Sequence, residues 1–143
     1  MSISSPFVSI IMNCFNGEEF LNESINSVIN QTYKNWEIIF WDNQSTDNSA
    51  KILQGFKDKR IKYFYSSKHT SLGEARNLAI EKATGDLIAF LDVDDLWMKE
   101  KLEKQVPLFL DLQVGLVISN TIFFNEKGDI KTYYKNPPST GFV

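Results

Sequence analysis

The segment LIAFLDVDD, residues 87–95, joins an apolar run directly to three aspartates. Continuous apolar runs such as residues 87–91 are typical of strands that are buried on both faces. Asp92, Asp94 and Asp95 follow at the end of this run, and carboxylates so close together repel one another unless a cation or a donor network compensates. Hard oxygen ligands on a short loop suit Mg²⁺ or Mn²⁺, which usually share their coordination with substrate phosphates. The segment therefore predicts a buried strand that ends at a site for a divalent cation and a phosphorylated ligand.

Strands and helices alternate along the rest of the chain. Apolar runs predict three earlier strands, over residues 7–12, 36–41 and 61–65. Apolar residues at helical spacing predict four helices, over residues 18–30, 48–56, 71–82 and 99–110. Two further strands are expected to form a hairpin, over residues 114–124 and 130–134. This order predicts an α/β fold of three layers, α/β/α, with a mostly parallel sheet and right-handed crossovers.

Three polar loops follow the predicted strands, at residues 13–17, 42–47 and 92–95. In an open α/β sheet, ligands bind outside the carboxyl ends of the strands, so these loops are expected to meet at one site. Neither acidic loop has the glycine that an EF-hand needs at its sixth position.

The composition excludes several classes of protein. The 143 residues, 43% of them hydrophobic, suffice for one domain with one core. A net charge of -3 provides no basic field for a nucleic acid, so none is expected as a partner. Cys14 is the only cysteine, which fits a reducing, cytoplasmic compartment. No apolar run reaches the roughly 18 residues of a membrane span, so a soluble protein is expected, with peripheral contact to the inner face of a membrane left open.

Six segments carry a more specific pattern, at residues 8–16, 27–33, 36–47, 73–77, 83–86 and 90–95. In this order they resemble the family 2 glycosyltransferases, inverting enzymes with the GT-A nucleotide-sugar fold. An isolated Asp-x-Asp occurs by chance in many proteins, whereas six ordered segments are specific. The resemblance implies transfer of a sugar from a nucleotide-diphospho-sugar, with a UDP-linked donor expected, to a glycan or lipid-linked acceptor in polysaccharide biosynthesis.

The resemblance also implies roles for single side chains. Phe15 matches an aromatic position that stacks on the base, and Asp42 matches an aspartate that accepts a hydrogen bond from the base. Arg76 matches a basic residue that faces the nucleotide and suits a phosphate through its planar fork. Asp92 and Asp94 form the Asp-x-Asp pair, with Asp94 expected nearer the ribose. The full nucleotide-binding set is Asn13, Phe15, Asn16, Asp42, Arg76, Asp92 and Asp94.

The expected metal ligands are Asp94 and Asp95, with Asp95 nearer the ion. Mn²⁺ or Mg²⁺ would neutralise the diphosphate as the anomeric bond breaks. The sequence departs from the family pattern at Asn13, where proline is common, at Phe15, where tyrosine is frequent, and at residues 43–44, where aspartate and glycine are usual.

Length is the larger departure, because such domains normally continue well beyond this chain with the acceptor site and an acidic base. No residue is assigned as that base, and Glu126 and Asp129 lie in the expected hairpin turn. We therefore expect residues 1–135 to be the donor-binding half of a GT-A domain and residues 136–143 to begin a truncated connector. An incomplete domain would expose apolar surface, so a homodimer is also expected.

Several alternatives remain open. The chain could be an inert nucleotide-sugar-binding module, or a different α/β nucleotide binder, although it has neither Gly-x-Gly-x-x-Gly after its first strand nor a P-loop lysine. The acidic loop could merely cap the next helix, and residues 45–47 are expected to cap the second helix. Arg76 could pair with Glu74 or another nearby carboxylate, and Phe15 could belong to the core. His69 is interpreted as a surface residue without a role.

Overall fold

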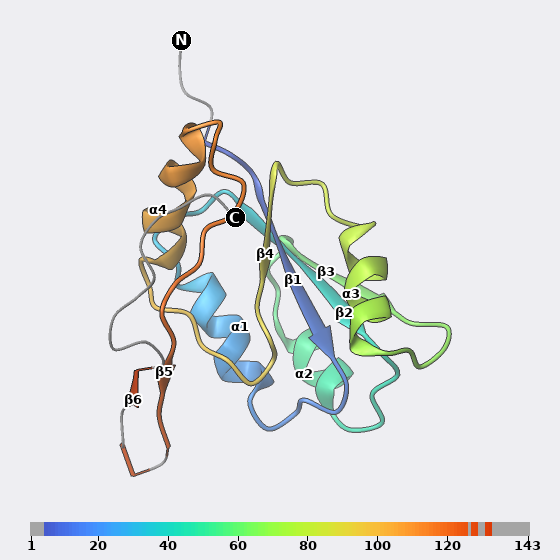
Figure 1. Ribbon diagram of the computed structural model, residues 1–143. Coiled ribbons are helices and arrows are strands. Elements are labelled where there is room, and N and C mark those ends of the chain that lie inside the picture. The colour runs from blue at the N-terminus through green and yellow to red at the C-terminus, as the bar shows by residue number, and fades with distance from the viewer. Residues whose placement is uncertain (1–4, 126, 129–130, 133–143) are drawn as a thin grey trace. The chain divides into compact units, whose positions relative to one another are not determined.

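The computed structural model describes residues 5–125, 127–128 and 131–132 (Figure 1). The chain divides into two compact units, Met1–Pro107 and Leu108–Val143. The first unit contains the predicted alternation of strands and helices. The domain boundary expected at residue 135 stays a prediction.

The first unit is built on a four-stranded sheet in the order β3-β2-β1-β4. Its strands are β1 Val8–Cys14, β2 Trp36–Asp42, β3 Ile61–Tyr65 and β4 Leu87–Phe90. All three strand pairings are parallel, as the alternating pattern predicts. Strands β2 and β3 lie on one side of β1, and β4 lies on the other, so the strand order reverses at β1. Parallel sheets bind ligands at such a switch point.

Helices cover both faces of this sheet, so the predicted three-layer architecture is confirmed (Figure 1). They are α1 Leu21–Ile29, α2 Ser49–Gly55, α3 Leu72–Ile80 and α4 Lys101–Gln105. The helix expected over residues 99–110 is wrong in its second half, where a 3₁₀ helix, η1, runs over Val106–Leu110. Pro107 lies inside η1, and its missing N–H and its ring are incompatible with a continuing α-helix.

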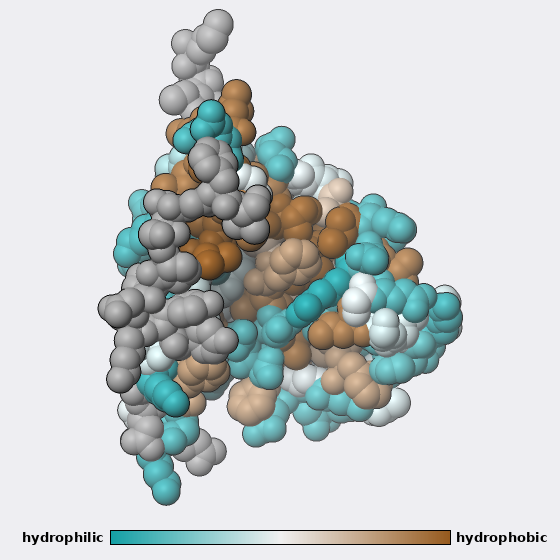
Figure 2. Space-filling model, in the orientation of Figure 1, coloured by the Kyte–Doolittle hydropathy of each residue, from teal (hydrophilic) through white to brown (hydrophobic). Residues whose placement is uncertain are grey.

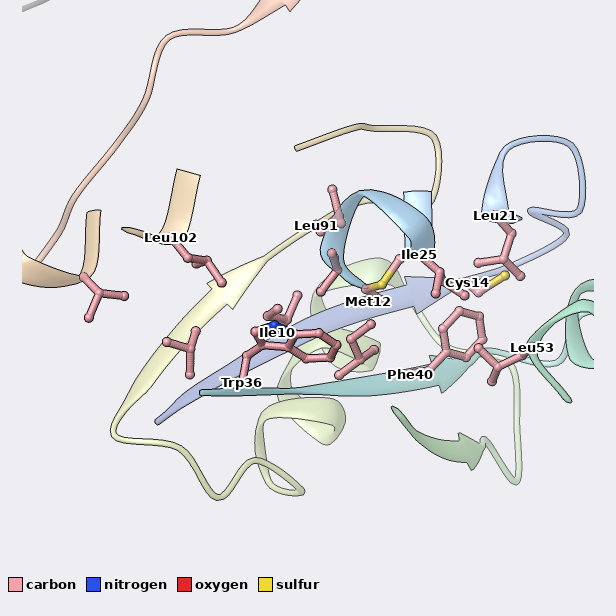
Figure 3. Packing of buried hydrophobic residues seen from close by; sticks show 14 residues of the cluster. Ile10, Met12, Cys14, Leu21, Ile25, Trp36, Phe40, Leu53, Leu91 and Leu102 are labelled. Carbon is pink, nitrogen blue, oxygen red and sulfur yellow. The ribbon is translucent and has the colours of Figure 1, made fainter. Parts of the chain in front are cut away.

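Alternate residues of the central strands form the larger part of the core. Ile10 and Met12 of β1 and Phe40 of β2 are fully buried against Leu21 and Ile25 of α1 (Figure 3). The intervening positions face α3 on the other side of the sheet, in a second cluster of Ile11, Ile39, Trp41, Ala75 and Ala79. Burial on both faces explains why these strands are apolar without interruption.

Polar residues of α1 and of the turn after it hold the chain that follows β4. Gln31 is fully buried; its Nε2 donates to the Met98 carbonyl at 2.8 Å, and its Oε1 accepts the Leu102 N–H at 3.1 Å. One turn earlier, Ser27 Oγ accepts the Trp97 N–H at 3.1 Å. The side chain of Gln31 thus supplies hydrogen-bond partners to a carbonyl before α4 and to an N–H in the first turn of α4.

Truncation of Gln31 is expected to destabilise the fold. In Gln31→Ala, the buried Leu102 N–H loses its partner and the Met98 carbonyl loses a donor, which should lower the free energy of unfolding by about 2 kcal/mol in a urea titration. Asn30→Ala, a change at the exposed neighbouring position, serves as the control. Equal midpoints for the two variants would contradict this role of Gln31.

A second buried network lies at the amino-terminal end of the sheet. Glu37 of β2 is buried; its Oε1 accepts from Ser9 Oγ at 2.6 Å and from the N–H and Oγ1 of Thr84 at 2.9 Å, and its Oε2 pairs with Lys62. Burial alone would raise the pKa of Glu37, but the bonds from Lys62, Ser9 and Thr84 outweigh it and hold the pKa below its ordinary value.

This network predicts an acid-dependent loss of stability. A carboxylate whose pKa is depressed on folding stabilises the fold above its ordinary pKa, and this contribution is lost as the pH falls through the lower folded value. Urea unfolding at about pH 7 and about pH 3 should show a smaller pH dependence in Glu37→Gln than in the wild type. Glu81→Gln, at an exposed site, should keep the wild-type dependence. The same dependence in all three proteins would refute the prediction.

Strand β4 is an edge strand of this sheet. Its residues Ile88 and Phe90, which point away from the α1 cluster, are 40% and 50% exposed. The prediction that this strand is buried on both faces is therefore wrong, because, in the part of the chain that the structure describes, no helix on the second face of the sheet covers β4 to the same extent as the central strands. Figure 2 shows hydrophobic surface over the region where Figure 1 places β4. The expected exposed apolar surface is therefore present on this unit, while the homodimer stays a prediction.

The second unit contains a short antiparallel pair, β5 Ile122–Phe123 with β6 Lys131–Thr132. The expected hairpin is thus present over four residues, and residues 114–121 have no regular structure. Glu126, Asp129 and residues 136–143 lie outside the described residues. In the described part of the chain, every helix is too short or too polar to cross a membrane.

Candidate functional site

The loops after β1 and β2 are hydrogen-bonded to each other. Cys14 pairs with Asp42 in the parallel register, so the two strands end side by side. The Asn16 N–H donates to Ser45 Oγ at 3.0 Å, and Asn16 Oδ1 accepts the Thr46 N–H at 2.8 Å. Asn16 has a φ of 55°, a left-handed conformation that asparagine adopts more readily than most residues. These bonds fix the backbone directly after β1.

A cavity of about 230 Å³ lies at these strand ends. Its lining residues are Asn13, Cys14, Phe15, Asn43, His69, Thr70, Leu72 and Ala75. The Phe15 side chain is 52% exposed, and its ring centroid lies 4.4 Å from that of His69. The alternative that Phe15 belongs to the core is therefore wrong. An exposed aromatic ring beside a cavity offers a flat apolar surface on which a planar ligand can stack.

Two of the lining residues, Asn43 and His69, had no role in the sequence analysis. Asn43 Nδ2 donates to the Thr70 carbonyl at 2.8 Å, and its Oδ1 accepts from the N–H and Oγ1 of Thr70, both at 3.1 Å. His69 Nδ1 lies 2.9 Å from the Asn43 carbonyl oxygen. Asn43 directly follows Asp42, a predicted site residue. His69 is separated from Asp42 by α2 and β3, and no local sequence pattern links these two residues.

The Asp42 carboxylate is fully buried, and the residues that line the cavity do not include it. Its Oδ1 accepts the Ser45 N–H at 2.7 Å, and its Oδ2 accepts the Tyr63 hydroxyl at 2.8 Å. Burial and the bond to Asp42 raise the pKa of Tyr63, which keeps this hydroxyl a donor. Asp42 thus anchors the loop after β2, and its expected contact with a base stays a prediction.

Asn13 and Cys14 line the cavity in different ways. Asn13 Nδ2 has no hydrogen-bond partner within the part of the chain that the structure describes. The Cys14 thiol is 1% exposed, and burial raises its pKa, so it remains protonated and acts as a small packing group. The buried Asn13 amide nitrogen therefore lies beside the cavity as an unsatisfied donor of the described residues.

The acidic loop begins directly after β4, at the same edge of the sheet as the cavity loops, because β4 pairs in parallel with β1. Arg76 of α3 donates from Nη2 to Asp92 Oδ1 at 2.8 Å, and its guanidinium carbon lies 5.9 Å from the Phe90 ring centroid. The nearby carboxylate with which Arg76 pairs is thus a member of the acidic loop. Glu74 pairs with Lys68 instead.

The structure corrects both capping expectations. Helix α4 has Glu100 as its N-cap residue, so the alternative that the acidic loop merely caps the next helix is wrong. Helix α2 has Asn48 as its N-cap residue, while Asp47 Oδ1 accepts the N–H of Ser49 at 2.9 Å. The expectation that one of residues 45–47 is the cap of the second helix is therefore wrong, although Asp47 supports the first helical N–H.

Asp94 and Asp95 form no ion pair with a lysine or arginine among residues 5–125, 127–128 and 131–132. Burial, followed by the charges of Asp94 and Asp92, raises the pKa of Asp95. Over the same residues, no three His, Cys, Asp or Glu side chains converge on one metal position. This donor set fits a divalent cation that takes one or two carboxylates and completes its shell with ligand phosphates, and it does not fit a closed protein cage.

The loop after β1 also packs against the acidic loop. A Cβ atom at Gly17 would lie 2.9 Å from Val93 Cγ2 and 3.1 Å from Cys14 Sγ, which is too close for ordinary contact. In addition, Ser24 Oγ of α1 donates to the Asp92 carbonyl at 3.3 Å. The position of the aspartates thus depends on the absence of a side chain at Gly17.

The sheet order, the cavity and the acidic loop at one edge define an open α/β protein whose polar groups gather where such sheets bind ligands. The chain belongs to Glycosyl transferase family 2, because the family model matches residues 9–142. This match confirms the family that the sequence motifs indicate.

Similar proteins are named as glycosyltransferases. An Escherichia coli protein, UDP-Glc:alpha-D-GlcNAc-diphosphoundecaprenol beta-1,3-glucosyltransferase WfgD, is 40% identical over 118 residues, which cover 82% of this chain and 47% of WfgD. The putative teichuronic acid biosynthesis glycosyltransferase TuaG of Bacillus subtilis is 39% identical over 74% of this chain and 43% of its own length. The chain therefore spans about half the length of these relatives.

Solved structures of GT-A transferases have the same fold. Staphylococcus aureus TarS 1–349 in complex with UDP-GlcNAc matches with a TM-score of 0.69 and 28% identity, over 75% of this chain and 32% of that one. The mannosyltransferase PcManGT of Pyrobaculum calidifontis, in complex with GDP-Man and Mn²⁺, matches with a TM-score of 0.73 and 23% identity, over 79% and 35%. The predicted GT-A fold class is thus confirmed, for a chain that covers part of each neighbour.

Gly17→Ala is expected to disturb the acidic loop. The added methyl group must displace Val93 or Cys14, which should cost about 1–3 kcal/mol in the free energy of unfolding. Gly55→Ala at the end of α2 meets no atom within 4 Å and is the matched control. Chemical denaturation of both variants tests the contact, and a Gly17→Ala protein as stable as the control would disprove it.

Proposed function

We propose that this chain is the donor-binding half of a glycosyltransferase that takes a sugar from a UDP-linked donor with the help of Mn²⁺ or Mg²⁺. The observation that carries the proposal is the arrangement of a cavity with an exposed aromatic ring and an acidic loop at the same edge of the sheet. A nucleoside diphosphate needs these two parts together, a surface for its base and a cation for its phosphates.

The relatives support a uridine donor in particular. WfgD, at 40% identity, is named for UDP-Glc, and TarS, at 28% identity, is solved with UDP-GlcNAc. WfgD is also named for a diphosphoundecaprenol acceptor, which supports a lipid-linked acceptor. The location at the cytoplasmic face of a membrane stays a prediction. TuaG supports a role in the synthesis of a cell-surface polysaccharide.

Each side chain of the site then has a part in donor binding. Phe15 provides a stacking surface for the base, and Asn13 offers it a donor. Arg76 already neutralises Asp92, and its remaining N–H groups suit the diphosphate. Asp94 and Asp95 would hold the cation. The family resemblance also places Asp94 near the ribose.

In the proposed reaction, an acceptor hydroxyl oxygen forms a bond to the anomeric carbon as the bond from that carbon to the diphosphate breaks. The electron pair of the broken bond leaves with UDP, and the hydroxyl proton passes to a base, for which no described residue is assigned. When bound, the cation stabilises the negative charge on the departing diphosphate. The residues of this chain would therefore assist the departure of the leaving group, UDP.

A donor-binding module without activity of its own is the second candidate, because the chain spans about half of its relatives. Incubation with UDP-glucose separates the two candidates. Release of UDP by the chain would exclude the inert module, whereas binding without release would support it.

The metal assignment predicts a loss of cation-dependent affinity. Asp95→Asn should weaken UDP binding in the presence of Mn²⁺ at least about tenfold, or about 1.4 kcal/mol, in isothermal titration calorimetry. Without Mn²⁺, the variant and the wild type should bind UDP equally. Asp111→Asn, the same change at an exposed aspartate of the second unit, is the control.

Asp94→Asn provides a second measurement at the same loop. If both loop variants bind UDP with Mn²⁺ as tightly as Asp111→Asn does, the acidic loop is not the cation site. If the wild-type protein binds no UDP under any of these conditions, the proposed function itself is wrong.

A further inference from the structure

His69 lies in the cavity although nothing in its sequence neighbourhood points to a ligand. Its ring centroid is 4.4 Å from that of Phe15, with an angle of 60° between the two planes. Both residues line the same cavity, and both side chains are largely exposed. Two exposed aromatic rings from distant parts of the chain thus meet beside one small cavity.

The hydrogen bond to Asn43 determines which nitrogen of His69 carries the hydrogen. A backbone carbonyl oxygen can only accept, so the Nδ1 atom, 2.9 Å from the Asn43 oxygen, must donate. In the neutral ring, Nε2 is then left as an acceptor. Because the two nitrogens lie on different sides of the ring, Nε2 points away from Asn43.

The loop that carries His69 is fastened to the end of β2 on both sides of this residue. Before it, the Ser66 N–H donates to the Asp42 carbonyl at 2.8 Å. After it, the Thr70 backbone both donates to and accepts from the Asn43 amide. Ser66, Thr70 and Asn43 are all buried, so the position of the imidazole is determined before a ligand binds.

The chemistry of the cavity suits a nucleobase better than a phosphate. Arg76 and the acidic aspartates are absent from the residues that line it, so the charged groups that suit a diphosphate lie outside it. An outward acceptor at Nε2 would repel phosphate oxygens, whereas it complements an N–H group. Uracil offers one such group, its N3–H, on a flat ring of the kind that stacks on Phe15.

We infer that His69 binds the nucleobase of the donor, with Nε2 accepting a hydrogen bond from N3–H of uracil beside the Phe15 ring. The family resemblance gives this part to Asp42, but here the Asp42 carboxylate is buried and accepts from Ser45 and Tyr63. This inference rests on the proposed function, since it assigns a specificity-determining residue to the same donor site. The choice of base then depends partly on His69, which lies in the loop before α3 and not in a strand of the sheet.

The test compares UDP with its N3-methyl derivative in calorimetric titrations with Mn²⁺. The methyl group removes the hydrogen that Nε2 accepts, so the wild type should prefer UDP at least about tenfold. His69→Phe keeps a ring beside Phe15 but has no acceptor, and it should lose most of this preference. His69→Ala should lose the preference and also bind UDP more weakly. His69→Gln, whose Oε1 can accept a hydrogen bond, should retain part of the preference for UDP.

The ratio of the two affinities separates binding from a merely structural role. A loop that is only loosened would weaken both ligands by the same factor and leave their ratio unchanged. Ser67→Ala, at the exposed neighbouring position, should keep the wild-type ratio, and thermal unfolding of each variant checks its fold. A wild-type ratio in both His69→Phe and His69→Ala overturns the inference while leaving the proposed function intact. Absence of UDP binding by the wild type overturns both.

Discussion

Strand β1 has no free edge, because β2 and β4 pair in parallel with its two sides, and the rest of the structure depends on this arrangement. Parallel pairing forces the carboxyl ends of these strands to the same edge of the sheet. Burial on both faces leaves β1 and β2 without polar side chains to offer a ligand, apart from their ends. The polar chemistry of the protein is therefore concentrated in the loops that follow the strands.

Those loops hold their positions through hydrogen bonds to one another and to the first helix. The loop after β1 is bonded to the loop after β2, and the chain after β4 is held by Ser24 and Ser27 of α1 and by Gln31. The crowded carboxylates of the acidic loop receive one guanidinium, from Arg76, within the described residues. A backbone held in this way can carry uncompensated charge until a cation and a diphosphate supply the rest.

Most of the first unit could be predicted from periodicity, because its strands are long, apolar and separated by helices with a regular apolar stripe. The ends of the elements were less predictable. Helix α1 begins at Leu21 rather than residue 18, since the preceding residues form a turn bonded to Gly17. From Val106 onward, the predicted helix gives way to a 3₁₀ helix that contains Pro107. The expected long strand at residues 114–124 is regular only at Ile122–Phe123, where it pairs with β6.

By itself, the sequence determined the order of strands and helices, the family, and the identity of the acidic loop, because these follow from local patterns of apolar, turn and acidic residues. Only the tertiary structure decided which side chains share the cavity. Asp42 points into hydrogen bonds with Ser45 and Tyr63, while Asn43 and His69 face the cavity. The direction of a side chain at a strand end, and a contact between loops far apart in the chain, depend on how the strands pair, which no local pattern records.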